Sequence, residues 1–99
     1  MRNIVLVCSA GVTTSMLVQR MQAAADAQGY ECHVHAHPVA DVDVCGKDAD
    51  IVLLGPQVKF RLNEVKSKVS CPAEVIAPME YGQMNGEKVL ARVKEVLHD

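Results

Sequence analysis

The fold is decided by the stretch Ile4-Val5-Leu6-Val7-Cys8-Ser9-Ala10-Gly11-Val12-Thr13-Thr14-Ser15. Its first four residues are all aliphatic, which is typical of a strand buried on both faces in the centre of a parallel sheet. A loop of small residues follows, and then a helix predicted over Thr13 to Gln28, with Gly29 at its end. A buried strand, a small-residue loop and a helix in this order indicate a βα unit of an α/β domain.

The rest of the chain continues the alternation of strands and helices. Polar and apolar residues alternate over residues 31–37, which predicts a half-exposed edge strand. A short helix fits the weak signals of residues 39–49. The later elements are expected as strand 50–54, helix 58–68, strand 73–77, an irregular stretch from Met79 to Asn85, and helix 86–98. The pattern predicts an α/β fold, an open four-stranded parallel sheet flanked by helices, with strands 4–7 and 51–54 as neighbours.

Size and composition restrict what the chain does. Its 99 residues suit one domain over residues 1–99, and 49% hydrophobic with 22% charged residues is usual for a folded protein. The net charge is −2 and the basic residues are scattered, so we expect no nucleic-acid binding. No secretory signal is recognisable and no window reaches the ~20 apolar residues of a membrane span. We therefore expect a cytoplasmic protein with no direct membrane insertion.

Cysteines and histidines give no metal-binding pattern. Cys8, Cys32, Cys45 and Cys71 form no C-x-x-C pair, and in the cytosol they are expected to be free thiols, the last three as packing residues. Three histidines on one side of strand 31–37 are interpreted as a solvated edge-strand face rather than a metal site, because no carboxylate stands nearby to support them. These are His33, His35 and His37. We expect no metal and no cofactor.

Cys8 is the candidate functional residue. It stands at the end of a buried strand and just before a helix, where unpaired N–H groups and a partial positive charge favour an anion. The same partial positive charge at the start of the helix makes a thiol more nucleophilic. The loop from Ser9 to Ser15 would then cradle a phosphate, with its hydroxyl groups as additional donors. The residues of this phosphate-binding loop are Ser9, Ala10, Gly11, Val12, Thr13, Thr14 and Ser15.

Three segments resemble the lactose/cellobiose family of IIB components of the sugar phosphotransferase system (PTS). They are residues 4–18 around Cys8, the segment 49–58 with its Gly55-Pro56-Gln57 turn, and Tyr81-Gly82 followed by Asn85-Gly86. The resemblance implies a sheet in the order 2-1-3-4 within a three-layer sandwich, like that of flavodoxins and low-molecular-weight phosphatases. It also makes Gly55, Pro56, Gln57 and Tyr81 expected neighbours of the site.

The resemblance further implies a role as a phosphotransferase component. In this family the cysteine that matches Cys8 accepts a phosphoryl group from a histidine of a IIA protein. It then passes the group to a sugar bound by the membrane IIC transporter. For a carrier that docks transiently, a monomer is the expected state.

Two alternatives remain for Cys8. A low-molecular-weight tyrosine phosphatase or arsenate reductase shares the strand, cysteine loop and helix, but its C-x5-R signature places an arginine where this chain has Thr14. The arginine guanidinium that binds a phosphate dianion with two hydrogen bonds is therefore missing at that position. A redox-active thiol is the other alternative, since exposed, activated thiols oxidise readily.

Overall fold

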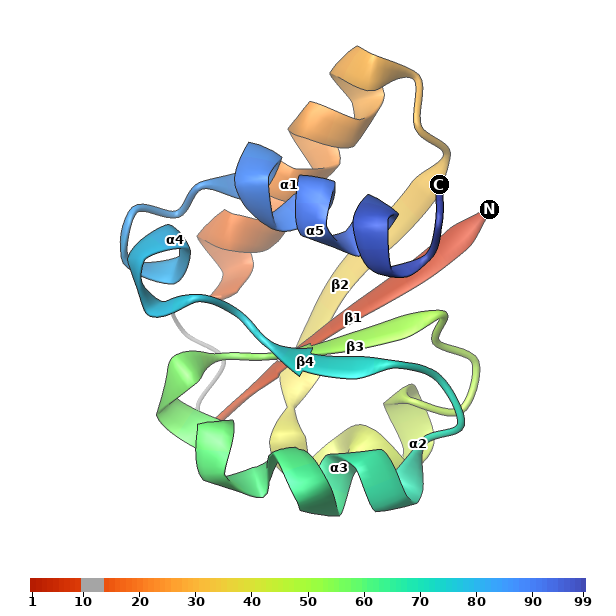
Figure 1. The fold of residues 1–99 in the computed structure, drawn as a ribbon, viewed down its shortest axis with the longest axis vertical. Coiled ribbons are helices and arrows are strands. Elements are labelled where there is room, and N and C mark those ends of the chain that lie inside the picture. The colour runs from red at the N-terminus through yellow and green to blue at the C-terminus, as the bar shows by residue number, and fades with distance from the viewer. Residues whose placement is uncertain (10–13) are drawn as a thin grey trace.

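The computed structural model describes residues 1–9 and 14–99, and these form a sheet flanked by helices (Figure 1). Within this described part the sheet has four parallel strands in the order β2-β1-β3-β4. The strands are β1 (Arg2–Cys8), β2 (Cys32–Pro38), β3 (Ile51–Leu54) and β4 (Ala73–Val75). Both the predicted order and the pairing of the two buried strands are confirmed.

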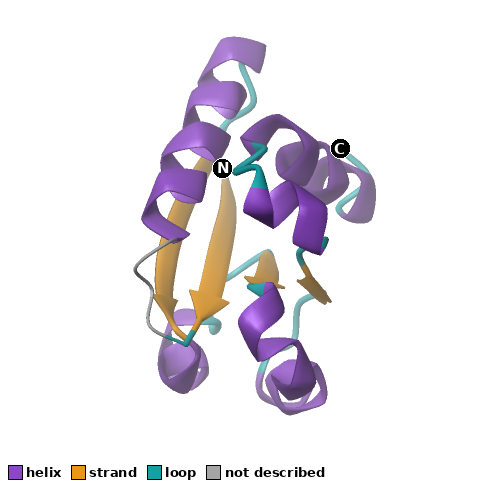
Figure 2. Ribbon diagram, turned by 90° about the vertical axis from the view of Figure 1, so that its left-hand side faces the viewer, coloured by secondary structure: helices purple, strands orange, loops and turns teal. Residues whose placement is uncertain are grey.

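Helices cover both faces of the sheet (Figures 1 and 2). One face carries α1 (Thr14–Gln28), α4 (Pro78–Gly82) and α5 (Gly86–Val96). The other carries α2 (Val42–Cys45) and α3 (Leu62–Lys68). Two 3-10 segments, η1 (Val39–Asp41) and η2 (Pro56–Arg61), follow β2 and β3. The predicted three-layer sandwich is therefore confirmed.

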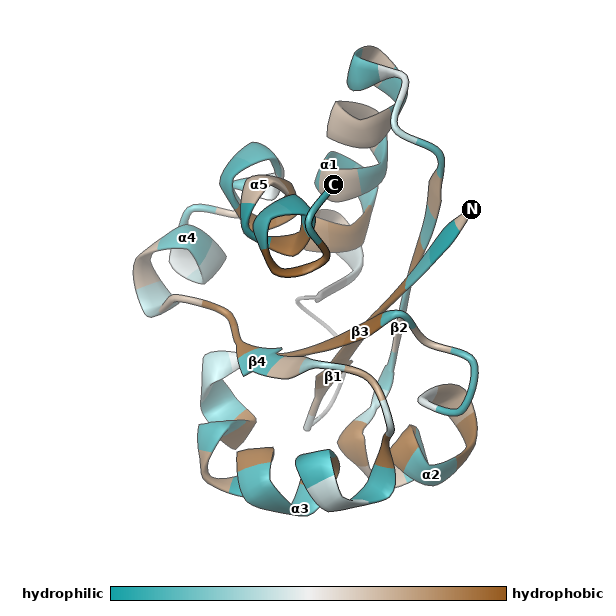
Figure 3. Cartoon of the chain, turned by 45° about the vertical axis from the view of Figure 1, so that its right-hand side comes forward, coloured by the Kyte–Doolittle hydropathy of each residue, from teal (hydrophilic) through white to brown (hydrophobic). Residues whose placement is uncertain are grey.

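The central strands divide the core into two halves because successive side chains of a strand point to opposite faces. Ile4 and Leu6 of β1 pack with α1 and α5, whereas Val5 and Val7 pack on the side of α2 and α3. All four are fully buried. Figure 3 shows the corresponding hydrophobic colour along β1 and β3. Burial on both faces explains why this strand is continuously apolar.

Two segments differ from the sequence prediction. The stretch predicted to be irregular contains α4, whose Pro78 suits the start of a helix and whose Tyr81 is buried against the core. Tertiary packing of that one ring stabilises a helix too short to be recognised by periodicity. The helix predicted over 58–68 is a 3-10 segment as far as Arg61 and an α-helix only from Leu62, and within η2 Val58 has non-helical dihedral angles (φ −117°, ψ 22°).

Candidate functional site

Cys8 is the last residue of the central strand β1 and is only 3% exposed. Strand β1 pairs with β2 on one side and with β3 on the other. In the pairing with β3, Val7 lies opposite Leu54. The backbone N–H of Gly55 donates to the carbonyl of Val7 at 2.9 Å, which extends the ladder one residue beyond β3. The thiol is therefore held at the carboxyl edge of the sheet, where open α/β sheets bind their ligands.

The turn after β3 brings Cys8 and Tyr81 together. A Cβ at Gly55 would lie 3.4 Å from the Cys8 Cβ, 3.6 Å from the Tyr81 Cε2 and 2.6 Å from the Gln57 Oε1. Gln57 in turn donates from its Nε2 to the Tyr81 hydroxyl at 3.1 Å. Because glycine has no side chain, Gly55 leaves room in this turn for the side chains of Cys8, Tyr81 and Gln57. Pro56 begins η2 and turns the chain away from the sheet.

Part of the predicted phosphate-binding loop lies within the described residues. Ser9 is exposed directly after the thiol, and Ser15 is exposed in the first turn of α1. Thr14 begins the helix. Residues 10–13, and with them the predicted roles of Ala10, Gly11, Val12 and Thr13, lie outside the described residues. The first turn of α1 contains no acidic residue, so no carboxylate there neutralises the positive end of this 15-residue helix.

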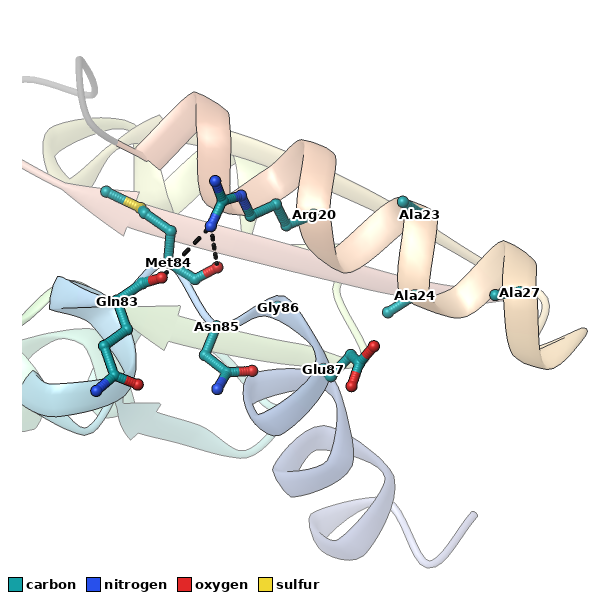
Figure 4. Close-up of a pocket in the computed structure, with 9 residues that line it drawn as sticks. All are labelled: Arg20, Ala23, Ala24, Ala27, Gln83, Met84, Asn85, Gly86 and Glu87. Carbon is teal, nitrogen blue, oxygen red and sulfur yellow. Dashed lines mark hydrogen bonds between the residues drawn. The ribbon is translucent and has the colours of Figure 1, made fainter.

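Arg20 is the first arginine after Cys8, and its guanidinium is engaged elsewhere (Figure 4). Its Nη1 donates to the carbonyls of Gln83 at 3.4 Å and Met84 at 3.3 Å. These contacts tie α1 to the connection between α4 and α5, beside a pocket of about 490 Å³ that Cys8 does not line. Arg20 therefore does not supply the phosphate-binding guanidinium that a tyrosine phosphatase requires.

The other three cysteines differ from Cys8 in their surroundings. Cys32 is buried in the core beneath α1, and Cys45 and Cys71 pack against the opposite half. Burial raises the pKa of each of these three thiols, which keeps them protonated at neutral pH. All are free cysteines. These positions agree with the prediction that the three cysteines are packing residues.

The three histidines of β2 share one side of the strand, as predicted, and two of them are hydrogen bonded. His35 Nε2 lies 2.6 Å from Asn3 Oδ1, and His35 Nδ1 lies 2.9 Å from His37 Nε2. Because the amide oxygen only accepts, His35 must donate from Nε2 and accept at Nδ1 from His37 when both rings are neutral. In the described ranges no group of three or more His, Cys, Asp or Glu residues is arranged to hold a metal ion.

We expect the stability of the protein to fall when the pH drops below about 6.5, the value of an unperturbed histidine. Burial and the neighbouring His37 and His33 lower the pKa of His35 in the folded state. The unfolded chain therefore takes up this proton first, so stability is complete above that pH and decreases below it. Urea unfolding at about pH 7.5 and about pH 5.5 should show a smaller loss for His35→Gln than for the wild type. An equal loss in both would contradict this assignment, and His98→Gln, at an exposed position outside β2, serves as the control.

No helix within the described residues is both long and apolar enough to cross a membrane.

Comparison with known proteins gives a match that extends over most of the chain. The family model described as "PTS system, Lactose/Cellobiose specific IIB subunit" matches residues 3–92. The galactose-specific EIIB component of Lactococcus lactis subsp. cremoris is 40% identical over 103 residues, covering 96% of this chain and 95% of that protein. The cellobiose-specific EIIB component of Lactococcus lactis subsp. lactis gives the same identity and coverage. Relatives named for two different sugars are thus equally similar to this chain.

Solved structures agree with the sequence relatives. The cellobiose-specific phosphotransferase IIB component of Borrelia burgdorferi superposes with a TM-score of 0.82 at 38% identity, covering 98% of this chain and 92% of that one. The lactose-specific IIB domain of Streptococcus pneumoniae has a TM-score of 0.83 at 21% identity and covers 96% of each chain, which supports the fold. With the matched family model and these relatives, the chain belongs to the lactose/cellobiose-specific IIB family and is a phosphotransferase component of a sugar PTS.

Proposed function

We propose that Cys8 carries a phosphoryl group that it accepts from a phosphohistidine of a IIA protein and donates to a sugar bound by a membrane IIC transporter. The observation that carries this proposal is the position of the thiol. Cys8 ends the central strand, lies against the Gly55 turn and precedes a helix whose first turn has no acidic residue. Family membership supports it as well. We further propose that residues 1–99 act as one IIB domain, as a monomer in the cytoplasm.

The first half-reaction is a phosphoryl transfer from nitrogen to sulfur. The Cys8 thiolate attacks phosphorus, the S–P bond forms as the N–P bond breaks, and the electron pair of the broken bond returns to the donor imidazole. In-line transfer of this kind depends on positioning and on groups that stabilise the negative charge. In our proposal this stabilisation comes from the positive end of α1 and from the N–H groups of the phosphate-binding loop, Ser9 to Ser15.

The second half-reaction returns Cys8 to a thiolate. A sugar hydroxyl oxygen attacks phosphorus, the O–P bond forms and the S–P bond breaks, and the hydroxyl proton goes to a base. Gly55 and Tyr81, which meet Cys8 at the turn after β3, contain neither carboxylate nor imidazole. We therefore assign the base to the transporter. The lack of a carboxylate or imidazole on these two residues also suits a phosphocysteine that must survive in water until it is used.

Intact-mass spectrometry tests the proposal. The protein is incubated with phosphoenolpyruvate, enzyme I, the histidine phosphocarrier protein and, in turn, several IIA proteins. We expect a gain of one phosphoryl group with at least one IIA protein, and fragmentation should locate it on the peptide that contains Cys8. A gain located elsewhere, or no gain with any IIA protein, would contradict the proposal. Hydrolysis of an aryl phosphate by the isolated chain would instead favour the phosphatase alternative.

The redox alternative receives less support from the structure. It assumed an exposed thiol, whereas Cys8 is almost completely buried. Oxidants in solution therefore meet little of the sulfur surface.

A further inference from the structure

Two histidines of the edge strand β2 line a groove that the proposed phosphoryl transfer does not use. His35 and His37 are half-buried, and the groove has a volume of about 460 Å³. In the pairing of β2 with β1, the two histidines lie opposite Val5 and Val7, which pack on the side of α2 and α3. The imidazole rings therefore lie on the same side of the sheet as α2, which contributes to the lining of the groove. Cys8 does not line it.

The facing ring nitrogens of the two histidines have the separation of two ligands on one metal ion. His35 Nδ1 lies 2.9 Å from His37 Nε2. Imidazole nitrogens bind a divalent metal such as zinc at about 2.0–2.1 Å, and two such bonds at a right angle place the nitrogens about 2.9 Å apart. Right angles are typical of the tetragonal sites of Cu²⁺ and Ni²⁺, whereas tetrahedral Zn²⁺ spreads its ligands wider. Because the ring torsion of histidine is soft, a modest rotation of each ring turns both lone pairs toward one ion.

Asn3 fixes which nitrogen of His35 has the lone pair. The Asn3 Nδ2 donates to the carbonyl of Asp48 at 3.1 Å, so its Oδ1 faces His35 Nε2, at 2.6 Å. An amide oxygen only accepts, and Nε2 therefore carries the proton while Nδ1, which faces His37, has the lone pair. Ligand histidines in proteins commonly donate their other N–H to an oxygen in this way. His37 becomes the second ligand when its proton moves from Nε2 to Nδ1, which leaves the ring neutral.

The fold adds carboxylates that the sequence did not lead us to expect beside the histidines. Asp41 of η1 and Asp48, which follows α2, are exposed and line the same groove. No lysine or arginine is among the described residues of its lining, so the groove favours a cation. Since the described residues hold no group of three such ligands, two imidazoles bind the ion and water completes its coordination. The carboxylates then act through their charge and by accepting hydrogen bonds from this water.

We propose that His35 and His37 chelate a divalent transition-metal ion of the Ni²⁺ or Cu²⁺ type in this groove, with Asn3 as a positioning residue. Three observations meet at this place: the separation of the two nitrogens, the hydrogen bond that orients one of them, and the acidic lining. The site does not depend on phosphoryl transfer, and it would stand if Cys8 had another role.

Isothermal titration of the protein with NiCl₂ tests the site. The protein carries no affinity tag, and the buffer lies about one pH unit above the ordinary histidine pKa, so that the rings are neutral. We expect one Ni²⁺ per chain with a Kd below about 0.1 mM. His37→Gln should raise the Kd about tenfold or more, because the second imidazole of a chelate binds at a high effective concentration. Ni²⁺ is the probe because, unlike Cu²⁺, it does not readily oxidise Cys45, which also lines the groove.

The matched control is His33→Gln, which makes the same change on the same strand at an exposed residue that does not line the groove. Its Kd should stay within about twofold of the wild type, as expected for a side chain that is not a ligand. Asn3→Ala should weaken binding about tenfold, and Asn3→Asp, which keeps an oxygen acceptor for His35, should restore it.

Three results would overturn the site. The first is a Kd for Ni²⁺ above about 0.1 mM in the wild type. The second is a loss in His33→Gln as large as that in His37→Gln, since the oriented pair would then have no special role. The third is equally tight binding of Mg²⁺, because this ion prefers oxygen ligands and would show that the carboxylates and not the imidazoles hold the cation. Circular dichroism of each variant verifies that it is folded.

Discussion

Cys8→Ser is expected to take up no phosphoryl group under conditions in which the wild type is fully phosphorylated. Serine replaces sulfur by oxygen with little change in volume, so the buried end of β1 and the turn at Gly55 should keep their structure. A serine hydroxyl remains protonated near neutral pH, whereas a thiol is partly ionised and is the better nucleophile. Intact-mass spectrometry of both proteins after equal incubation gives the answer in a single comparison.

Cys45→Ser and Cys71→Ser are the matched controls for this experiment. Both residues are half-buried thiols whose pKa is raised by burial, and neither lies at the carboxyl end of β1. Each control should take up one phosphoryl group as the wild type does. Phosphate uptake that survives in Cys8→Ser, or that is lost in either control, would remove Cys8 from the proposed role.

The parts of the fold that follow from local sequence were predictable. Residues 4–7 are apolar on both faces, and their burial in the centre of the sheet is what that pattern demands. Alternation along β2 likewise indicated an edge strand. The nearness of Gly55 to Cys8 follows from the predicted pairing of strands 4–7 and 51–54, whereas the nearness of Tyr81 came from resemblance to a family. Nothing local to Cys8 or Tyr81 encodes a contact between segments so far apart in the chain.

The parts that were not predictable depend on tertiary contacts. The helix α4 has only five residues and is held by the burial of Tyr81, which leaves no periodic signal. The kink at Val58 inside η2 is similarly invisible, since Val58 fits the apolar stripe of a continuous helix. From the sequence Gly86 is the first residue of a helix and part of a segment that resembles the family, whereas the structure gives it a packing role.

Gly86→Ala is expected to destabilise the protein by about 3 kcal/mol, as overpacking against backbone does. A Cβ at this position would lie 2.5 Å from the carbonyl carbon of Arg20 and 2.6 Å from the backbone nitrogen of Met21. Both atoms belong to the middle of α1, so no side-chain rotation relieves the clash. The two helices must move apart, and the buried contacts of Met21 and Leu90 between them and the sheet are loosened. Urea unfolding monitored by circular dichroism measures the change.

Gly82→Ala is the control for the general effect of replacing a glycine in this region. It lies at the end of α4, and a Cβ there meets no atom within 4 Å. Alanine should change the free energy of unfolding by no more than about 0.5 kcal/mol in either direction, as is usual for surface sites. A large loss in Gly86→Ala with none in Gly82→Ala would mean that α1 and α5 are held at a separation only glycine permits. Equal, small effects in both variants would show that α5 approaches α1 less closely than the structure has it.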